Sequence, residues 1–429
     1  MTANLAFRED RMARRVTGGE NLPAWPILVM LWGFPVMWLV GMTVVPAAVT
    51  MTGVMVAFMA RHRDIPVVPG MGAFLAFTTW VLASGVMLDS APRALGFLYR
   101  FAIILFALVA FVYTVSARRA LTLRSVVNAL AFVWLFTIVG GILGMLLPDI
   151  RLSTPVGLAL PSSLTSNEYV RDLFFPPLAE VQHPWGSPFV FVRPSAPFPY
   201  ANSWGVAILV LTPVAVACFL MARTWMTRVG LIVAAVALVP PAMATSNRGM
   251  LAGLCLAVTY IVVRLAVRNR AAPVLGLAAV GLSAVLFMVS RGLLDHIAAR
   301  QLYGQSDGAR FSLYAETIRR TLEHPLLGHG APRPSHVQEL SVGTQGYIWT
   351  LMFSHGFVGL ALFLLFLWGT TVRTWRAPTD IELVLHSVLV VASVAIVVYG
   401  LDFMQMLAVV LVAALLLRRR YGLDEDADP

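Results

Sequence analysis

The sequence predicts an all-α polytopic membrane protein with about 12 transmembrane helices, and three observations support this fold class. Of its 429 residues, 59% are hydrophobic and 12% are charged, whereas soluble domains have roughly 45–50% apolar and about 25% charged residues. The apolar residues fall into runs of about 20, the length that spans a bilayer as a helix. Arginine recurs at every second connection between these runs. This composition excludes a disordered chain, a disulfide scaffold and a water-soluble enzyme.

Each apolar run is predicted to be one transmembrane helix, because roughly 20 helical residues cross the hydrocarbon core. The first two runs meet at Pro46, and the last two are separated by only Gly400 and Asp402, so eleven spans are an alternative. The predicted spans are 25–44, 46–60, 70–88, 95–116, 124–147, 202–222, 229–245, 250–267, 272–290, 343–371, 382–400 and 402–418.

The distribution of arginine predicts the orientation of the spans, because short cytoplasmic loops collect basic residues. The sequence contains no lysine, and most of its arginines lie in alternate connections, at 8–15, 61–63, 118–124, 223–228, 264–270, 373–376 and 418–420. Both termini are therefore predicted to be cytoplasmic. Residues 1–24 form an N-terminal segment, 25–420 form a single integral membrane domain, and 421–429 form a solvated acidic tail.

Two long segments are predicted to lie on the outer side, at about 148–201 and 291–342. The first is rich in proline and is predicted to be an irregular loop packed on the membrane. The second contains a predicted amphipathic helix that lies in the outer headgroup layer. His324-Pro325 is predicted to end this helix, with a turn at Gly328 and Gly330. Its apolar face consists of Phe311, Tyr314, Ile318 and Leu322.

Several arginines lie on the outer side against the positive-inside bias, so a reason other than topology is expected for them. They are Arg93, Arg100, Arg151, Arg171, Arg193, Arg248, Arg291, Arg300, Arg310, Arg319, Arg320 and Arg333. Among them, Arg193 is the first residue of the run RPSAPFPYANSWG, in which Asn202 is the first residue of a predicted span. Arg248 lies in the hairpin Thr245-Ser246-Asn247-Arg248-Gly249.

The order of these features resembles the O-antigen ligase and O-antigen polymerase superfamily. The features are Arg-x(8)-Asn at 193–202, Ser-x-Arg-Gly at 246–249, Arg310 followed by His-Pro-Leu-x-Gly-x-Gly at 324–330, and a polar turn followed by Gly-x-x-Gly at 356–359. The resemblance covers about 193–360. It implies a membrane-embedded, metal-independent inverting glycosyltransferase of the GT-C type in the bacterial cytoplasmic (inner) membrane, with an extracytoplasmic active face.

The resemblance also implies a reaction in cell-surface polysaccharide assembly. A glycan would pass from an undecaprenyl diphosphate carrier to a glycan or lipid acceptor at the outer face, with membrane lipids as further partners and no nucleic acid. The lipid diphosphate leaves with negative charge, which arginine forks can pair bidentately. Arg248, Arg310 and Arg193 are the expected clamp, so no metal site and no cofactor is expected.

One position departs from the family pattern. Family members usually have a histidine where this sequence has Gln345, and glutamine cannot take a proton from an acceptor hydroxyl. Either a base in the same loop acts, or the acceptor needs none, or transfer activity has been lost. The catalytic candidates are Arg248, Arg310, Gln345 and His336, and the substrate-binding candidates are Arg193, Asn202, His329 and Glu339; His336, His329 and Glu339 are also the candidate bases.

Structural interpretations and other functions stay open from the sequence. Arg248 could be a snorkelling residue that fixes the end of a span, and Arg193 could have a structural role in its loop. Arg310 could bind lipid headgroups. Arg319 and Arg320 could form a pair that faces solvent or headgroups. A transporter or lipid-linked sugar flippase is one alternative, although the spans hold few carboxylates and the halves show no similarity. A non-catalytic scaffold in envelope glycan assembly is another, suggested by Gln345.

Overall fold

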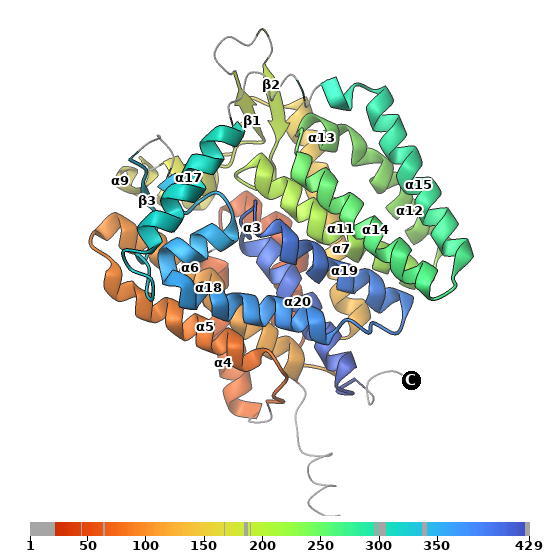
Figure 1. Cartoon of the computed structure of the whole chain (residues 1–429), viewed down its shortest axis with the longest axis horizontal. Helices are drawn as coiled ribbons and strands as arrows, with labels where there is room; N and C mark the ends of the chain where they lie inside the picture. Colours follow the sequence, from red (N-terminus) through yellow and green to blue (C-terminus); the bar gives the residue numbers. More distant parts are fainter. Residues whose placement is uncertain are drawn as a thin grey trace, which may run out of the picture.

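The computed structural model shows a mostly helical protein (Figure 1), and its long apolar helices are those of an all-α membrane protein. It describes residues 22–43, 45–62, 65–166, 168–183, 188, 190–295, 298, 306–336 and 341–424. Each of the 12 predicted spans coincides with a helix or a pair of helices. Within the described residues, six helical segments are long and apolar enough to cross a membrane: Ala91–Ser116, Leu123–Leu146, Ala201–Met221, Trp225–Ala244, Arg248–Val267 and Tyr347–Arg373. The count of twelve spans stays a prediction.

The first predicted span, 25–44, is divided into two short helices. The division falls at Gly33, and the second helix ends at Gly41, which adopts a left-handed conformation with φ of 84°. The elements up to residue 146 are α2 (Trp25–Trp32), α3 (Phe34–Val40), α4 (Val45–His62), α5 (Met71–Ser84), η1 (Gly85–Met87), α6 (Ala91–Ser116) and α7 (Leu123–Leu146).

The segment at 148–201 was predicted to be an irregular loop, and this prediction is wrong. Proline starts a helix well because its φ is already helical and its missing N–H would be unpaired there anyway. Pro155 accordingly opens the first short helix, and the Thr154 side chain accepts a hydrogen bond from the Gly157 N–H over 3.1 Å. The elements are α8 (Pro155–Ala159), α9 (Ser162–Thr165), α10 (Glu168–Phe174) and the antiparallel strands β1 (Ala179–Gln182) and β2 (Phe191–Pro194).

The middle of the chain forms one side of the helical bundle in Figure 1. The predicted span 229–245 is divided at Leu238, just before Pro240 and Pro241, which cannot continue a helical hydrogen-bond ladder. The elements are α11 (Ala201–Met221), α12 (Trp225–Ala237), α13 (Val239–Ala244), α14 (Arg248–Val267) and α15 (Ala271–Ser290).

The last part of the chain contains the predicted amphipathic helix and the centre of the bundle. Its elements are α17 (Ser306–Thr321), β3 (Arg333–Pro334), β4 (Ser341–Val342), α18 (Tyr347–Arg373), α19 (Asp380–Ala395) and α20 (Phe403–Arg420). Nearly every side chain of α20 is buried against its neighbours. Helix α20 is therefore the core around which α6, α11 and α19 pack.

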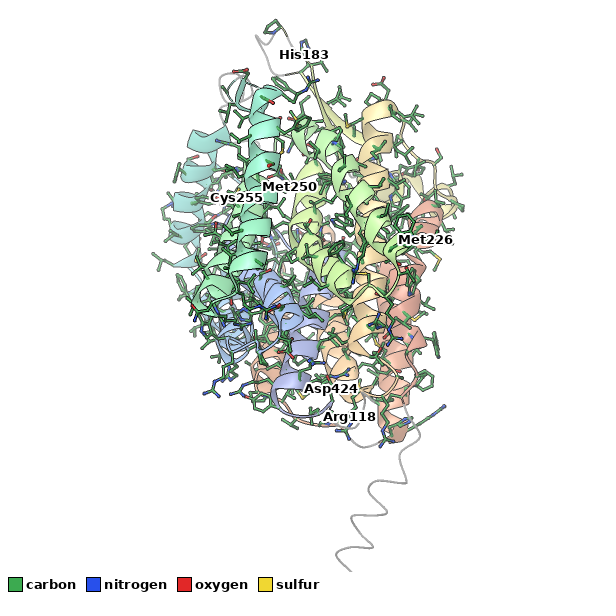
Figure 2. All side chains as sticks on the ribbon, turned by 90° about the vertical axis from the view of Figure 1, so that its right-hand side faces the viewer. Arg118, His183, Met226, Met250, Cys255 and Asp424 are labelled. Atoms are coloured by element: carbon green, nitrogen blue, oxygen red, sulfur yellow. The ribbon has the colours of Figure 1, made fainter. Side chains whose placement is uncertain are left out.

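The molecule has two distinct ends. Figure 2 shows His183, which follows β1, at one end, and Arg118 and Asp424 at the other. Helix α17 and the β1–β2 hairpin lie toward the end that carries His183, which we call the loop end (Figure 1). The site residues that the sequence predicts lie toward this loop end, some of them close together and others apart.

Candidate functional site

Arg193 is held at the loop end by an internal ion pair. In the β1–β2 hairpin it stands directly opposite Glu180, and its Nη1 donates to Glu180 Oε2 over 2.8 Å. Its Nε donates to the Thr245 carbonyl over 3.0 Å, and its Nη2 donates to Asn202 Oδ1 over 3.0 Å. The Arg193 side chain is only 3% exposed. Arg193 thus joins the hairpin to the start of α11 and to the α13–α14 connection.

Glu180 and Asn202 complete this connection between the hairpin and α11. The second carboxylate oxygen of Glu180 accepts a hydrogen bond from the Ala201 N–H over 2.8 Å, at the first residue of α11. Burial lowers the pKa of Arg193, Glu180 opposes this shift, and the like charge of Arg310 adds to it. A guanidinium group stays protonated at neutral pH, so Arg193 remains a cation.

The hairpin before α14 is fastened by Tyr399, which lies between α19 and α20. Its hydroxyl donates to Asn247 Oδ1, and the same oxygen caps α14 by accepting from the Met250 N–H over 3.1 Å. A Cβ atom at Gly249 would lie 2.2 Å from the Tyr399 hydroxyl oxygen. The glycine of the Ser-x-Arg-Gly pattern is therefore required by the close approach of a phenol.

Three arginines converge around Tyr399. Its hydroxyl lies within electrostatic range of the guanidinium groups of Arg193, Arg248 and Arg310. Arg248 is also the first residue of α14, where the helix dipole adds partial positive charge. Like charges raise each other's energy when they gather in a region of low dielectric. Such a cluster is stabilised by an anion, and a diphosphate has the charge to match it.

Gln345 lies beside this cluster. Its backbone carbonyl accepts a hydrogen bond from the Tyr314 hydroxyl over 3.3 Å, and the Tyr314 ring stacks on Trp349 with centroids 4.2 Å apart. Two residues further on, the Tyr347 N–H donates to the Tyr399 carbonyl over 2.9 Å. The structure thus brings together Arg193, Asn202, Arg248, Arg310 and Gln345, which are distant in the sequence.

Helix α18 is broken at Gly356, which has φ of 70° and ψ of −177°. The His329 and Gly330 N–H groups donate to the carbonyls of Phe353 and Ser354, each over 2.8 Å. In return, the Phe357 N–H donates to the Pro325 carbonyl over 2.8 Å. The His-Pro-Leu-x-Gly-x-Gly segment therefore supplies the hydrogen bonds that the broken helix lacks.

The charged face of α17 is turned into the protein. Arg320 pairs with Glu316 over 3.2 Å, and its guanidinium lies 5.4 Å from the Phe353 ring centroid. The predicted solvated pair is thus wrong for Arg320, which is buried, whereas Arg319 is exposed. Burial would raise the pKa of Glu316, but hydrogen bonds from Ser335, the His336 N–H and Arg320 hold it below its ordinary value.

The opposite face of α17 is apolar and exposed. Phe311 is 72% exposed, Ile318 43% and Leu322 62%. The structure has a helix at the predicted place, and its inner contact is made by Leu313 and by polar side chains instead of the apolar face. An apolar face turned outward from a membrane-embedded protein is suited to contact lipid.

The remaining candidate bases lie away from the arginine cluster. The His336 N–H binds Glu316, about two turns or ~9 Å along α17 from Arg310. The His329 Nε2 lies 2.9 Å from the Arg320 carbonyl, almost three turns or ~15 Å along the helix, and its ring stacks on Phe353. Glu339 lies outside the described residues.

Sequence reasoning missed four residues that build this site: Glu180, Asn247, Tyr399 and Glu316. Asn247 carried a signal, because asparagine directly before a helical run is typical of an N-cap. Glu180 gave no signal, because its pairing with Arg193 depends on a hairpin that the prolines concealed. Tyr399 gave none either, because it lies at a break between two apolar runs.

Acidification is expected to loosen the contact between α17 and the 324–330 segment. Burial lowers the pKa of His329 below its ordinary value of 6.5. His329 therefore binds a proton more readily in the unfolded chain than in the folded protein. The stability that comes from burying neutral His329 is present above pH 6.5 and is lost as the pH falls below it. Thermal unfolding in detergent is expected to begin a few degrees lower at about pH 5.5 than at about pH 7.5. His329→Gln should reduce this difference, and an unchanged difference would contradict the assignment.

The described residues hold no group of three or more His, Cys, Asp or Glu side chains arranged to bind a metal ion. The cluster's chemistry is instead that of cations, a phenol and amides. A scan against protein-family models and a search of curated proteins both found no match for this sequence.

Proposed function

We propose that the protein transfers a glycan from an undecaprenyl diphosphate carrier to an acceptor at its loop end, as an O-antigen ligase or polymerase does. The observation that carries this proposal is the convergence of Arg193, Arg248 and Arg310 around Tyr399. The ordered motifs of the sequence support it independently. The loop end is taken as the extracytoplasmic face, because the arginine-rich connections that the positive-inside rule assigns to the cytoplasm include Arg118, at the opposite end (Figure 2).

In the proposed reaction, the acceptor hydroxyl oxygen forms a bond to the anomeric carbon from the face opposite the leaving group. The bond between that carbon and the diphosphate oxygen breaks, and the diphosphate leaves with the electron pair. Arg248 and Arg310 stabilise the charge that develops on this oxygen. Arg193 positions the site, because its three nitrogens donate to Glu180, Asn202 and the Thr245 carbonyl.

Gln345 is proposed to orient the acceptor hydroxyl by a hydrogen bond. His329 is buried and His336 lies near Glu316, both away from the arginine cluster. Their places favour, among the described residues, the alternative in which neither histidine acts as the base. The proton then passes to the departing diphosphate or to water, and inversion at the anomeric carbon follows from the single displacement.

The test uses purified protein in nanodiscs with an undecaprenyl diphosphate oligosaccharide and a chelator. Gel electrophoresis and mass spectrometry are expected to show a new glycan product that empty nanodiscs do not form. A ladder would identify a polymerase, and a single conjugate with an added lipid or glycan acceptor would identify a ligase. Failure to form product with every acceptor, although the donor binds, would refute transfer activity.

A further inference from the structure

A large groove runs along the outside of the bundle between α4 and the N-terminal half of α6. It has a volume of about 1220 Å³ and is covered at the loop end by α9 and α10. Pockets for drug-sized ligands have roughly 300–1,000 Å³, so this groove has room for a larger molecule. Its walls are mostly apolar and include Val45, Val49, Leu95, Leu98 and Leu105. Figure 1 shows α4, α6 and α9 on the same flank of the molecule.

Arg100 lies on the wall of this apolar groove. Its one described hydrogen bond runs from Nη1 to the Gly96 carbonyl on its own helix, over 3.4 Å. Within the described part of the chain no carboxylate forms an ion pair with it, although Asp402 is within electrostatic range. Arg93, on the same wall, is instead bound to Asp89 and to the carbonyls of His329 and Ala331. A cation at membrane depth is costly unless an anion joins it.

The groove continues toward the arginine cluster. Tyr99 and Leu173 line both the groove and a smaller pocket that reaches Tyr200 and Asp402. Asp402 lies close to Ser203, the neighbour of Asn202 in α11.

Arg100 also acts electrostatically on the start of α18. It is within electrostatic range of Tyr347, whose N–H binds the Tyr399 carbonyl. The inner end of the groove therefore lies next to the residues that hold the cluster together.

We propose that this groove binds the isoprenoid chain of the carrier lipid. The phosphate attached to the chain contacts Arg100, and the glycan-bearing phosphate lies toward Arg248 and Arg310. The choice of a polyprenyl phosphate over a bulk phospholipid rests on the proposed function, because only the carrier must reach the cluster. The apolar wall, the continuity with the cluster and a cation that forms no ion pair with a described carboxylate support one anionic lipid at this place.

The experiment measures binding of undecaprenyl phosphate, without a glycan, to the purified full-length protein in detergent by native mass spectrometry. Leu98→Trp and Val49→Trp fill the groove from α6 and α4, and both parent side chains are 58% exposed, so the fold should tolerate them. Leu82→Trp is the matched control, because Leu82 is 57% exposed on α5 and does not line the groove. Each groove variant is expected to weaken binding at least about tenfold, and the control less than about twofold.

Arg100→Gln tests the phosphate contact. It is expected to weaken binding of undecaprenyl phosphate about tenfold, because it removes charge-assisted hydrogen bonds. Equal displacement of the lipid by phosphatidylglycerol would overturn the choice of occupant. Unchanged binding in all the groove variants would overturn the site.

The outcomes separate this inference from the proposed function. If the wild-type protein transfers glycan and the groove variants bind lipid and transfer as it does, the groove proposal fails and the function stands. If the groove variants lose lipid binding while the wild-type protein transfers no glycan, the groove proposal stands and the function fails.

Discussion

Replacing Arg248 or Arg310 with alanine is expected to lower the rate of glycan transfer at least about a hundredfold each. Both guanidinium groups lie within electrostatic range of Tyr399, where a diphosphate would gather its charge. Loss of a single donor to developing negative charge typically costs two to three orders of magnitude in rate. The measurement is the initial rate at saturating donor in nanodiscs, together with the thermal unfolding midpoint of each variant.

Arg319→Ala is the matched control for these variants. Arg319 lies on α17, as Arg310 does, but its side chain is exposed. Its loss should change the transfer rate less than about threefold, as is usual for surface substitutions. Transfer at near wild-type rates by both Arg248→Ala and Arg310→Ala would contradict the proposal that these arginines bind the diphosphate. The flippase or scaffold alternatives would then explain the sequence better.

Replacing Gly356 with alanine is expected to destabilise the protein by more than about 4 kcal/mol. The backbone at 356 has a positive φ, which an L-residue adopts at a cost of about 1–3 kcal/mol. In addition, the new Cβ would lie 2.1 Å from the Leu326 carbonyl oxygen and 2.6 Å from the Pro325 carbonyl oxygen. Both contacts are with backbone atoms, which cannot move aside as a flexible side chain does. The measurement is the yield of monodisperse protein and its unfolding midpoint in detergent.

Gly72→Ala provides the comparison. A Cβ at Gly72 in α5 meets no atom within 4 Å, and alanine in a helix is favoured over glycine by roughly 0.5–1 kcal/mol. This variant should be as stable as the wild-type protein or slightly more stable. Equal stability of Gly356→Ala and Gly72→Ala would mean that α18 is continuous in solution.

The helical architecture was predictable because apolar content and run length have few other solutions in a membrane. Each predicted span contains helix, and the internal divisions fall where glycine or proline interrupts a run, at Gly33 and before Pro240. The hairpin at β1–β2 was not predictable in the same way. Its prolines indicate irregular backbone, whereas its register is set by a pairing of Glu180 with Arg193 that no local pattern reveals.

The candidate site was predictable in its residue types and only partly in its geometry. The sequence singled out Arg193, Arg248, Arg310 and Gln345 as a group, and the structure places them near Tyr399. The sequence could not indicate that Arg193 forms an ion pair with Glu180. Nor could it indicate which face of α17 packs inward, because a membrane offers the apolar face an environment of its own, and the charged face finds its partners in residues 316–336.

The break in α18 also constrains how the protein is assembled in the membrane. In hydrocarbon, each unsatisfied backbone group costs several kcal/mol. The carbonyls of Phe353 and Ser354 and the Phe357 N–H find their partners in residues 325–330, which precede α18 in the chain. Folding of that loop must therefore accompany the insertion of α18. The biogenesis of the last three helices is in this way coupled to the segment synthesised just before them.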